Sequence, residues 1–319
     1  MLSESQLSTA SSQCDQLGAA VAKVVHGKDD VIRLMIVALL AEGHVLIEDR
    51  PGVGKTTLAR SIAEALQLHM GRVQFTPDLL PSDITGNSIY DQKTTEFRFR
   101  PGPIFNNIVL GDEINRASPK TQSALLEVME ERQVTADGTT YQIPRPFLVI
   151  ATQNPIDMEG TYSLPEAQLD RFLMKLPIGY PSNEAEITML QTQLAGRNTP
   201  KVRPVLTEPE INALLELVPR VEVSPAVEAY IVSLVDQTRT LPEVRLGVSP
   251  RGSLALARGG RALALSLGQS YVTPEHVKIL APWVLSHRIL LAPEAELAGR
   301  NSQDIVDNVL HSVPVPRVP

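Results

Sequence analysis

Short apolar runs alternate with longer stretches of helical spacing in the first half of the chain. The runs are too short for typical helices, which need about ten residues or more: HVLIE (44–48), RVQF (72–75), NIVLGD (107–112), FLVIAT (147–152) and FLMKLPI (172–178). Apolar residues at helical spacing lie between several of them, most clearly over 56–68 and 118–133. Strands that alternate with helices predict a parallel sheet covered by helices on both faces.

Two segments depart from this alternation. Residues 5–41 have helical spacing throughout, and Gly43 ends the segment before the first apolar run. Residues 132–147 carry Asp137-Gly138 between β-rich flanks, a pair typical of the tight turn in a β-hairpin. We therefore expect a helical N-terminal segment and one hairpin inserted among the alternating strands and helices.

The pattern changes again after Pro177. Prolines become frequent around one helical pattern near 183–195, and from about 207 to 311 the pattern is helical throughout. Several of these helical patterns begin with Ser or Thr near Pro and an acid, residues preferred at a helix N-terminus. We expect a domain boundary near 185–200. An α/β domain over 1–190 then precedes a smaller all-α domain over 191–319, whose tail, SVPVPRVP, is rich in proline.

Composition fits a folded protein with a large core, since 43% of the 319 residues are hydrophobic and 20% are charged. No stretch of about 18 apolar residues occurs, so no membrane span is predicted. The N-terminus lacks the basic-then-apolar order of a secretion signal. The single cysteine, Cys14, excludes an internal disulfide, and a cytoplasmic location is expected. The six histidines are scattered, so we expect no protein-held metal cluster.

The first apolar run leads into a glycine-rich loop followed by a helix. The stretch IEDRPGVGKTTLARSI (47–62) matches the phosphate-binding pattern G-x-x-x-x-G-K-[ST], except that Asp49 stands at the first glycine position. Its backbone N–H groups and lysine would hold phosphates, and the Thr56 hydroxyl would bind Mg²⁺. An ordinary strand–helix turn that contains a lysine is the alternative. The candidate residues are Gly52, Gly54, Lys55, Thr56 and Thr57.

Polar side chains follow two later strands of the same predicted sheet. Asp112 and Glu113 end the apolar run at 107–112, where an acid can hold Mg²⁺ and its neighbour can polarise a water for attack on a γ-phosphate. Asn154 follows the run at 147–152 and could bind that water or the phosphate. A solvated acid pair and a simple Asn-Pro turn are the alternatives. The order of these motifs favours a nucleotide site.

Two arginines could stabilise charge on a transferring phosphoryl group. Arg171 lies in LPEAQLDRFL, and Arg251 lies in GVSPRGS at the start of a helical pattern. Taken alone, Arg171 is as well explained by a surface pair with Asp170 or Glu166, and Arg251 by an exposed helix start.

Four segments, in this order and spacing, closely resemble the MoxR family of AAA+ ATPases: RPGVGKTTLA, IVLGDEINRASPKTQSALLEVMEERQVTADG, IATQNPIDMEGTYSLPEAQLDRFLMKLPIGYP and GVSPRGS. The resemblance runs from about residue 18 to 311, and it implies a role for each matching residue. Asn154 would be sensor 1, Arg251 sensor 2, and Arg171 the arginine finger that reaches a neighbouring subunit's ATP. The Walker A residues would be Pro51, Gly52, Val53, Gly54, Lys55, Thr56 and Thr57, and the Walker B residues Asp112 and Glu113.

The resemblance also implies an architecture and a function. It implies a five-stranded parallel sheet flanked by helices, a helical lid, and a hexameric ring that uses ATP and Mg²⁺. Residues 24–32, which include His26 and Gly27, would pack against adenine. Residues 83–105 would be an insertion into the second helix that faces the ring pore, and 132–147 the hairpin before sensor 1. Family members act as chaperone-like motors that mature or activate protein complexes, often with a von Willebrand factor A domain partner.

Three alternatives stay open. A nucleic-acid motor would need a basic hairpin, whereas ADGTTYQI carries Asp137 and no lysine or arginine, and the net charge is −7. A regulatory protein that binds nucleotide without turnover would be expected to have lost some of the candidate catalytic residues. A metal-insertion motor of the chelatase type shares the hairpin-bearing clade, but the stretch EINRASPKTQSALLEVMEERQV favours MoxR.

Overall fold

A five-stranded parallel sheet lies at the centre of the first part of the chain, in the computed structural model that describes residues 2–50, 52–154, 161–194 and 202–316. The strand order is β2-β5-β8-β1-β9. Each strand coincides with a predicted apolar run, and the predicted α/β fold is confirmed. The bounds are β1 Val45–Glu48, β2 Met70–Gln74, β5 Ile108–Asp112, β8 Leu148–Gln153 and β9 Met174–Leu176.

Alternate side chains of these strands enter two separate cores. On β1, Val45 and Ile47 join one core, and Leu46 joins the other. A strand sends successive side chains to opposite faces, so unbroken apolar runs indicate a sheet buried on both sides. Helices α1, α2 and α3 contribute to the first core and α5 to the second. The helices of this part are α1 Glu4–Ala22, α2 Asp29–Leu40, α3 Lys55–Ala65, α4 Pro81–Thr85, α5 Pro119–Glu131, α6 Glu166–Leu169 and α7 Asn183–Leu194, with 3₁₀ turns at Pro103–Phe105 and Ile114–Arg116.

The N-terminal segment is two helices, where the sequence predicts helical structure over the whole of 5–41. Helix α1 ends at Ala22 and α2 begins at Asp29. Between them Gly27 adopts φ +67°, which a right-handed helix cannot accommodate. The apolar spacing continues across the break because both helices face the same core.

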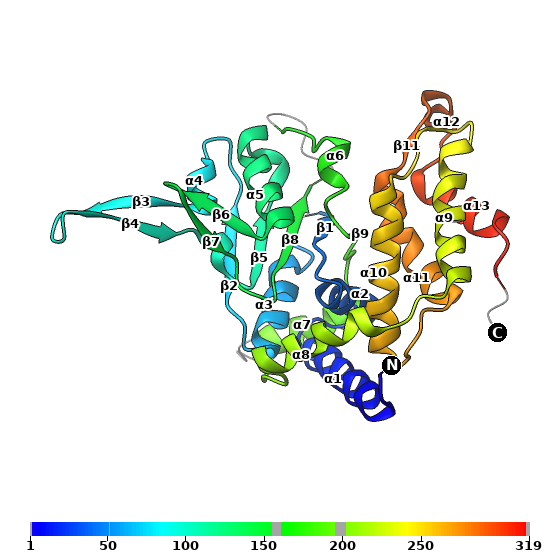
Figure 1. The fold of residues 1–319 in the computed structure, drawn as a ribbon, viewed down its shortest axis with the longest axis horizontal. Helices are drawn as coiled ribbons and strands as arrows, with labels where there is room; N and C mark the ends of the chain where they lie inside the picture. Colours follow the sequence, from blue (N-terminus) through cyan, green and yellow to red (C-terminus); the bar gives the residue numbers. More distant parts are fainter. Residues whose placement is uncertain (1, 51, 155–160, 195–201, 317–319) are drawn as a thin grey trace.

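Two β-hairpins lie beside the sheet. The predicted hairpin forms from β6 Gln133–Ala136 and β7 Thr139–Gln142, with Asp137 and Gly138 at positive φ in its turn. The segment 83–105 forms a second hairpin, β3 Gly86–Asp91 and β4 Glu96–Pro101, which projects from the body (Figure 1). The side chain of Phe99 in β4 stacks on Tyr141 of β7 at 4.2 Å between ring centroids, so the two hairpins support each other.

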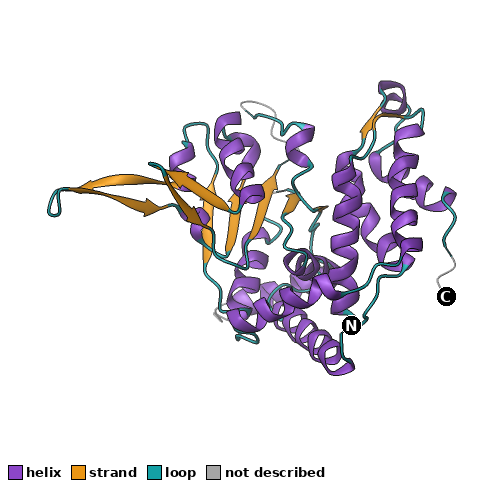
Figure 2. Cartoon of the chain, viewed as in Figure 1, coloured by secondary structure: helices purple, strands orange, loops and turns teal. Residues whose placement is uncertain are grey.

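The second part of the chain is mainly helical, and its helices α9 to α13 are gathered on the side of the molecule away from the β3–β4 hairpin, while α8 lies below the sheet beside α7 (Figures 1 and 2). Helix α10 packs against α1 and α2 and joins the two parts. Ser224, Ser249 and Thr273 cap helices that continue with proline, as the sequence predicts. The helices are α8 Glu208–Leu217, α9 Pro225–Thr240, α10 Pro250–Ser266, α11 Pro274–Leu285, α12 Pro293–Leu297 and α13 Ser302–Ser312, with 3₁₀ turns at Val218–Arg220 and Ser286–Arg288.

The prediction that 207–311 is helical throughout is wrong at one place. The short strands β10 Val244–Leu246 and β11 Leu290–Leu291 pair antiparallel between the helices. The predicted division into 1–190 and 191–319 falls within α7 and stays a prediction. None of the described helices is both long enough and apolar enough to cross a bilayer.

Candidate active site

The glycine-rich loop joins the carboxyl end of β1 to helix α3. Gly52 and Gly54 adopt φ +84° and +94°, a backbone conformation that strains other residues. A Cβ added at either glycine would meet no atom within 4 Å, so the space beside the loop is open. Gly54 is the N-cap of α3, whose first backbone N–H groups lack partners within the helix. The loop is therefore suited to an anion such as a phosphate.

Asp49, the residue at the missing-glycine position, does not line the loop's cavity. Its Oδ1 accepts a hydrogen bond from the Arg50 N–H at 2.7 Å, and its Oδ2 accepts from Ile178 at 2.9 Å and Gly179 at 2.5 Å. The carboxylate therefore ties the start of the loop to the chain after β9. The acid thus has a structural role at a position where the loop needs no glycine.

Lys55 lies at the base of the loop, where its Nζ donates to the Asp49 carbonyl oxygen at 2.5 Å. Partial burial lowers the pKa of the Lys55 ammonium, while the nearby acids Asp49, Asp112 and Glu113 oppose that shift. Burial lowers the pKa because it removes water from the charged ammonium, and a bound phosphate would raise the pKa again.

The acids Asp112 and Glu113 stand at the tip of β5, next to the loop. Asp112 Oδ2 accepts from Arg72 Nε at 2.7 Å. Glu113 adopts φ +59°, a strained conformation that costs about 1–3 kcal/mol and is common at functional sites. Its N–H donates to Thr152 Oγ1 at 2.9 Å, while its carboxylate accepts from Gln74 at 3.0 Å and Arg116 at 2.9 Å.

One cavity of about 370 Å³ brings the loop and the acids together. Its lining includes the Thr56 hydroxyl and the Asp112 carboxylate, whose oxygen atoms are the type of ligand that Mg²⁺ prefers. The residues therefore fit a magnesium–phosphate group. The lining consists of Gly52, Gly54, Lys55, Thr56, Thr57, Arg72, Gln74, Asp112, Glu113, Thr152 and Asn154.

Three of the described candidate cofactor residues do not line this cavity. The Val53 side chain is buried in the first core. His26 and Gly27 lie between α1 and α2, where Gly27 faces Ser182 and Ala185 near the start of α7 and outside the described cavity. Their contact with adenine stays a prediction. Pro51 lies outside the described residues.

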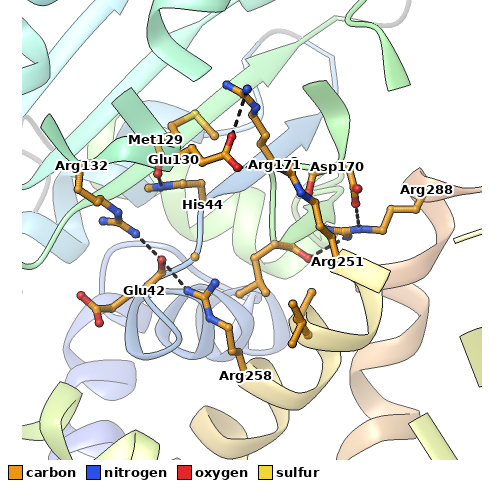
Figure 3. A pocket seen from close by; sticks show the side chains of 14 residues that line it. Glu42, His44, Met129, Glu130, Arg132, Asp170, Arg171, Arg251, Arg258 and Arg288 are labelled. Carbon is orange, nitrogen blue, oxygen red and sulfur yellow. Dashed lines mark hydrogen bonds and ion pairs between the residues drawn. The ribbon is translucent and has the colours of Figure 1, made fainter. Parts of the chain in front are cut away.

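The two candidate arginines, Arg171 and Arg251, lie in a different cavity, of about 300 Å³ (Figure 3). They come from the turn after α6 and from the start of α10, and they point toward the same carboxylate. Arg171 Nη2 lies 3.1 Å from Glu130 Oε2, and Arg251 Nη2 lies 2.6 Å from Glu130 Oε1. The sequence-based alternative for Arg171, a surface pair with Asp170 or Glu166, differs from the structure, in which Arg171 and Arg251 share Glu130 on α5. Asp170 instead accepts from Arg288 Nε at 2.6 Å.

The two cavities lie at opposite ends of the parallel sheet. The arginine cavity contains Gly43 and His44, which precede β1, and Leu173, which precedes β9. The loop cavity contains residues that follow β1 and residues at the carboxyl ends of β5 and β8. The four residues of β1, a strand length of about 13 Å, lie between the residues of the two cavities. The structure therefore does not bring Arg171 or Arg251 to the glycine-rich loop of their own chain.

Residues that the sequence interpretation missed hold the two acids in place. Arg72 and Gln74 stand two positions apart on β2, and Thr152 is the last residue but one of β8. They meet the acids because β2 and β8 flank β5 in the sheet. The alternation in the run MGRVQ indicates a strand with a polar face, but only the strand order shows which acids that face meets.

Two family profiles match this chain. The ATPase family associated with various cellular activities (AAA) matches residues 44–174, which hold the sheet, and the AAA lid domain matches residues 236–309. The first match covers the glycine-rich loop, both acids and Arg171. The second covers Arg251.

Several proteins are similar over most of the chain. YeaC of Bacillus subtilis, a protein of uncharacterised function, is 52% identical, covering 94% of this chain and 95% of its own. Chaperone MoxR1 of Mycobacterium tuberculosis is 44% identical, with coverage of 93% and 81%. Protein MoxR of Methylorubrum extorquens is 32% identical, with coverage of 93% and 93%.

The fold matches a crystal structure of a protein from Cytophaga hutchinsonii described as a candidate ATPase. The TM-score is 0.92 at 37% sequence identity, and the match covers 98% of both chains. The sheet, the lid and the glycine-rich loop are thus parts of one recognised architecture. The chain belongs to the MoxR family of AAA+ ATPases.

Proposed function

We propose that this protein hydrolyses ATP as a chaperone-like motor, in a closed ring of subunits that remodels, matures or activates other protein complexes. The observation that carries the proposal is the separation of the loop cavity from the arginine cavity across the sheet. Each cavity holds half of a phosphoryl-transfer site. Head-to-tail contacts between copies would join the two halves, and such contacts generate rings when the rotation closes. Six subunits is the number that the family resemblance implies.

In this proposal one subunit binds the nucleotide. The N–H groups of the loop and the positive end of α3 hold the phosphates, and Lys55 leaves the Asp49 carbonyl to reach them. Thr56 and Asp112 would hold Mg²⁺, directly or through its water shell. The bound ion would neutralise phosphate charge and orient the β- and γ-oxygens.

The same subunit would activate the attacking water. The Glu113 carboxylate is held by Gln74 and Arg116, and it would turn to accept a proton from water aligned by Asn154. The water oxygen attacks the γ-phosphorus, the bond to the β-phosphate oxygen breaks, and ADP leaves.

The neighbouring subunit would supply positive charge to the transition state. Arg171 and Arg251 share one carboxylate, so two guanidinium groups face a single competing anion. An arginine provided across an interface is commonly worth about 10³–10⁵ in rate. Arg251, which the family pattern implies as sensor 2, would therefore act on the neighbour's nucleotide together with Arg171.

The partners proposed here are protein clients and a von Willebrand factor A domain protein. The alternative of a nucleic-acid motor has no support from the β6–β7 hairpin, whose turn carries Asp137 and not a cation. A metal-insertion motor of the chelatase type is likewise not favoured by any feature of the described residues.

Mixed rings test the proposal. Lys55→Ala subunits should bind ATP poorly, and Arg171→Ala subunits should fail to complete a neighbour's site, so each variant alone should be nearly inactive. In a mixture, a Lys55→Ala subunit can still lend its Arg171 to an intact loop, and ATPase activity should partly return. The measurement is phosphate release against mixing ratio, with subunit exchange verified by pull-down of differently tagged chains.

The double variant Lys55→Ala/Arg171→Ala, mixed with inactive single variants, is the matched control and should give no recovery. If verified mixed assemblies of the two single variants stay inactive, shared sites are excluded. Glu113→Gln should bind ATP and hydrolyse it at least about 10²-fold more slowly, and undiminished hydrolysis would exclude Glu113 as the base.

A further inference from the structure

Arg72 forms an ion pair with Asp112, the carboxylate that is proposed to hold Mg²⁺. Arg72 Nε donates to Asp112 Oδ2 at 2.7 Å, and the hydroxyl of Thr152 lies 3.4 Å from Oδ1. The charge of the carboxylate is therefore matched by a protein cation before a metal arrives. Both Arg72 and Asp112 line the loop cavity.

The sheet fixes this contact. Arg72 and Gln74 lie two positions apart, so both side chains leave the same face of β2. Gln74 is level with Asp112 in the β2–β5 pairing, and Arg72 is level with Leu110. Arg72 therefore reaches forward along the strands to the carboxylate. No other arginine or lysine forms an ion pair with Asp112 among the described residues.

The guanidinium can leave this place at little cost. The Arg72 side chain is 55% exposed, whereas that of Asp112 is 11% exposed. An exposed arginine stays hydrated when its pair opens, so the guanidinium itself loses little when it leaves. The carboxylate is nearly buried, so it needs a cationic partner at all times. A metal ion can replace the arginine, but an empty site would leave the carboxylate uncompensated.

We propose that Arg72 is a positioning residue that occupies the cation side of Asp112 in the nucleotide-free protein and moves to the phosphates when Mg²⁺ binds with ATP. This inference rests on the proposed function and adds regulation to the same site. Metal alone must displace Arg72 without offering it a new partner. Metal that arrives with a nucleotide also brings phosphate oxygens, which the guanidinium binds well. Arg72 thus makes metal binding depend on nucleotide.

The consequence is a coupling between two ligands. If Arg72 opposes metal more strongly without nucleotide than with it, each ligand raises the affinity for the other by the same factor. Removing Arg72 should strengthen the binding of metal alone and weaken the coupling. Direct metal–phosphate contacts would account for the coupling that remains.

Equilibrium binding tests this without any activity measurement. Mn²⁺, read by electron paramagnetic resonance, serves as the probe for the metal alone, and a fluorescent ADP analogue is titrated with and without Mg²⁺. Arg72→Gln should bind Mn²⁺ roughly fivefold more tightly than wild type. The factor by which Mg²⁺ raises the nucleotide affinity should be roughly fivefold smaller in Arg72→Gln than in wild type. Arg72→Lys keeps the charge and should lie between the two.

Arg98→Gln is the matched control. Arg98 is a similarly exposed arginine on the β3–β4 hairpin, at 63%, and its loss removes the same charge away from the cavity. It should leave both quantities at the wild-type values. Equal shifts in Arg98→Gln and Arg72→Gln would show a general charge effect and would overturn the inference.

A purely structural role for Arg72 predicts a different pattern. In that case Arg72→Gln would lower the melting temperature and leave the affinity for Mn²⁺ alone unchanged. If the Gln variant does not fold, unchanged Mn²⁺ affinity in Arg72→Lys and Arg72→Met overturns the inference in the same way. The Mn²⁺ titration needs no hydrolysis, so its failure is distinct from failure of the mixed-ring experiment.

Discussion

At the residue scale, the buried contacts of His44 are expected to make the stability of this protein depend on pH. His44 lies at the entrance of β1, where Nε2 lies 3.0 Å from the Met129 carbonyl oxygen and Nδ1 lies 3.0 Å from the Val149 N–H. One nitrogen must donate and the other must accept, so the ring is neutral in the fold. Burial, together with the nearby Arg132 guanidinium, lowers the pKa of His44 to about 3 from 6.5.

This shift predicts acid sensitivity in a defined pH window. Between pH 6.5 and about 3 the unfolded chain binds a proton at His44 that the folded protein refuses. The contribution to stability is therefore complete above pH 6.5 and falls by about 1.4 kcal/mol for each pH unit below it. Urea unfolding of wild type at about pH 7 and about pH 5 should reveal the loss.

The variant His44→Asn keeps an acceptor for Val149 and has no ring to protonate. Its unfolding free energy should lose about 2 kcal/mol less than that of wild type between about pH 7 and about pH 5. His69→Gln, which alters an exposed histidine, is the control and should keep the wild-type slope. An unchanged slope in His44→Asn would show that other groups cause the acid sensitivity.

The residues of the loop cavity differ in how well the sequence predicts them. Gly54, Lys55 and Asp112 follow apolar runs, and parallel strands bring such ends to one edge of the sheet. Arg72 gives no such signal, because its contact with Asp112 depends on β2 lying beside β5. The strand order arises from the packing of the whole sheet, which no local pattern contains.

The five sheet strands, which have two buried faces, were predicted well, whereas the strands β3, β4, β10 and β11 were not. The five sheet strands are apolar runs because both faces pack against side chains. The β3–β4 hairpin is mostly exposed and alternates polar with aromatic residues, so no apolar run marks it. The strands β10 and β11 have only three and two residues, too few to show any period.

The β3–β4 hairpin presents an aromatic pair where it extends from the body. The rings of Phe97 and Tyr90 face each other at 5.3 Å between centroids, and Phe97 as a whole residue is 74% exposed. Phe99, two positions on, is held at the base by Tyr141. The base is thus fixed by packing, while the outer aromatic residues are left free to contact another molecule.

We expect Phe97→Ser to weaken client binding and leave the fold intact. Truncating an exposed aromatic anchor costs about 1–2 kcal/mol of binding, or about tenfold in affinity. Fluorescence anisotropy with labelled, unfolded casein measures this with Glu113→Gln as the background, so that hydrolysis does not release the probe. The melting temperature should stay within about 2 °C of its parent.

Arg98→Ser is the matched control for the hairpin, since Arg98 adjoins Phe97 but points to the other face of β4. Its casein affinity should match that of the parent. If Phe97→Ser and the parent bind casein with equal affinity, the hairpin is excluded as the client contact, whatever the control shows.

At the scale of the whole molecule, Glu130 is one of the points where the lid contacts the sheet domain. Arg171 belongs to the sheet domain and Arg251 to the lid, and both pair with this one carboxylate on α5. The sequence, through its family resemblance, indicates that both arginines serve an ATP site. It does not indicate that they share an anion, because α5, α6 and α10 are far apart along the chain.

In the proposed ring, Glu130 would compete for these arginines with the phosphates bound by a neighbouring subunit. The arginine side chains are 29% and 48% exposed, so the pairs together contribute only about 1 kcal/mol. Glu130→Gln keeps the shape and removes the competing charge. Specific ATPase activity should rise with protein concentration in wild type, because each proposed site is completed by two subunits. In Glu130→Gln the half-maximal concentration should be about fivefold lower.

The adjacent Glu131→Gln provides the control, since Glu131 is an exposed acid on the same helix but does not line the arginine cavity. It should keep the wild-type concentration dependence, while Arg171→Ala should show no rise at any concentration. A higher half-maximal concentration in Glu130→Gln would mean that the carboxylate aligns the arginines for the neighbour and does not compete for them. Activity independent of protein concentration down to the detection limit, in wild type, would argue against shared sites altogether.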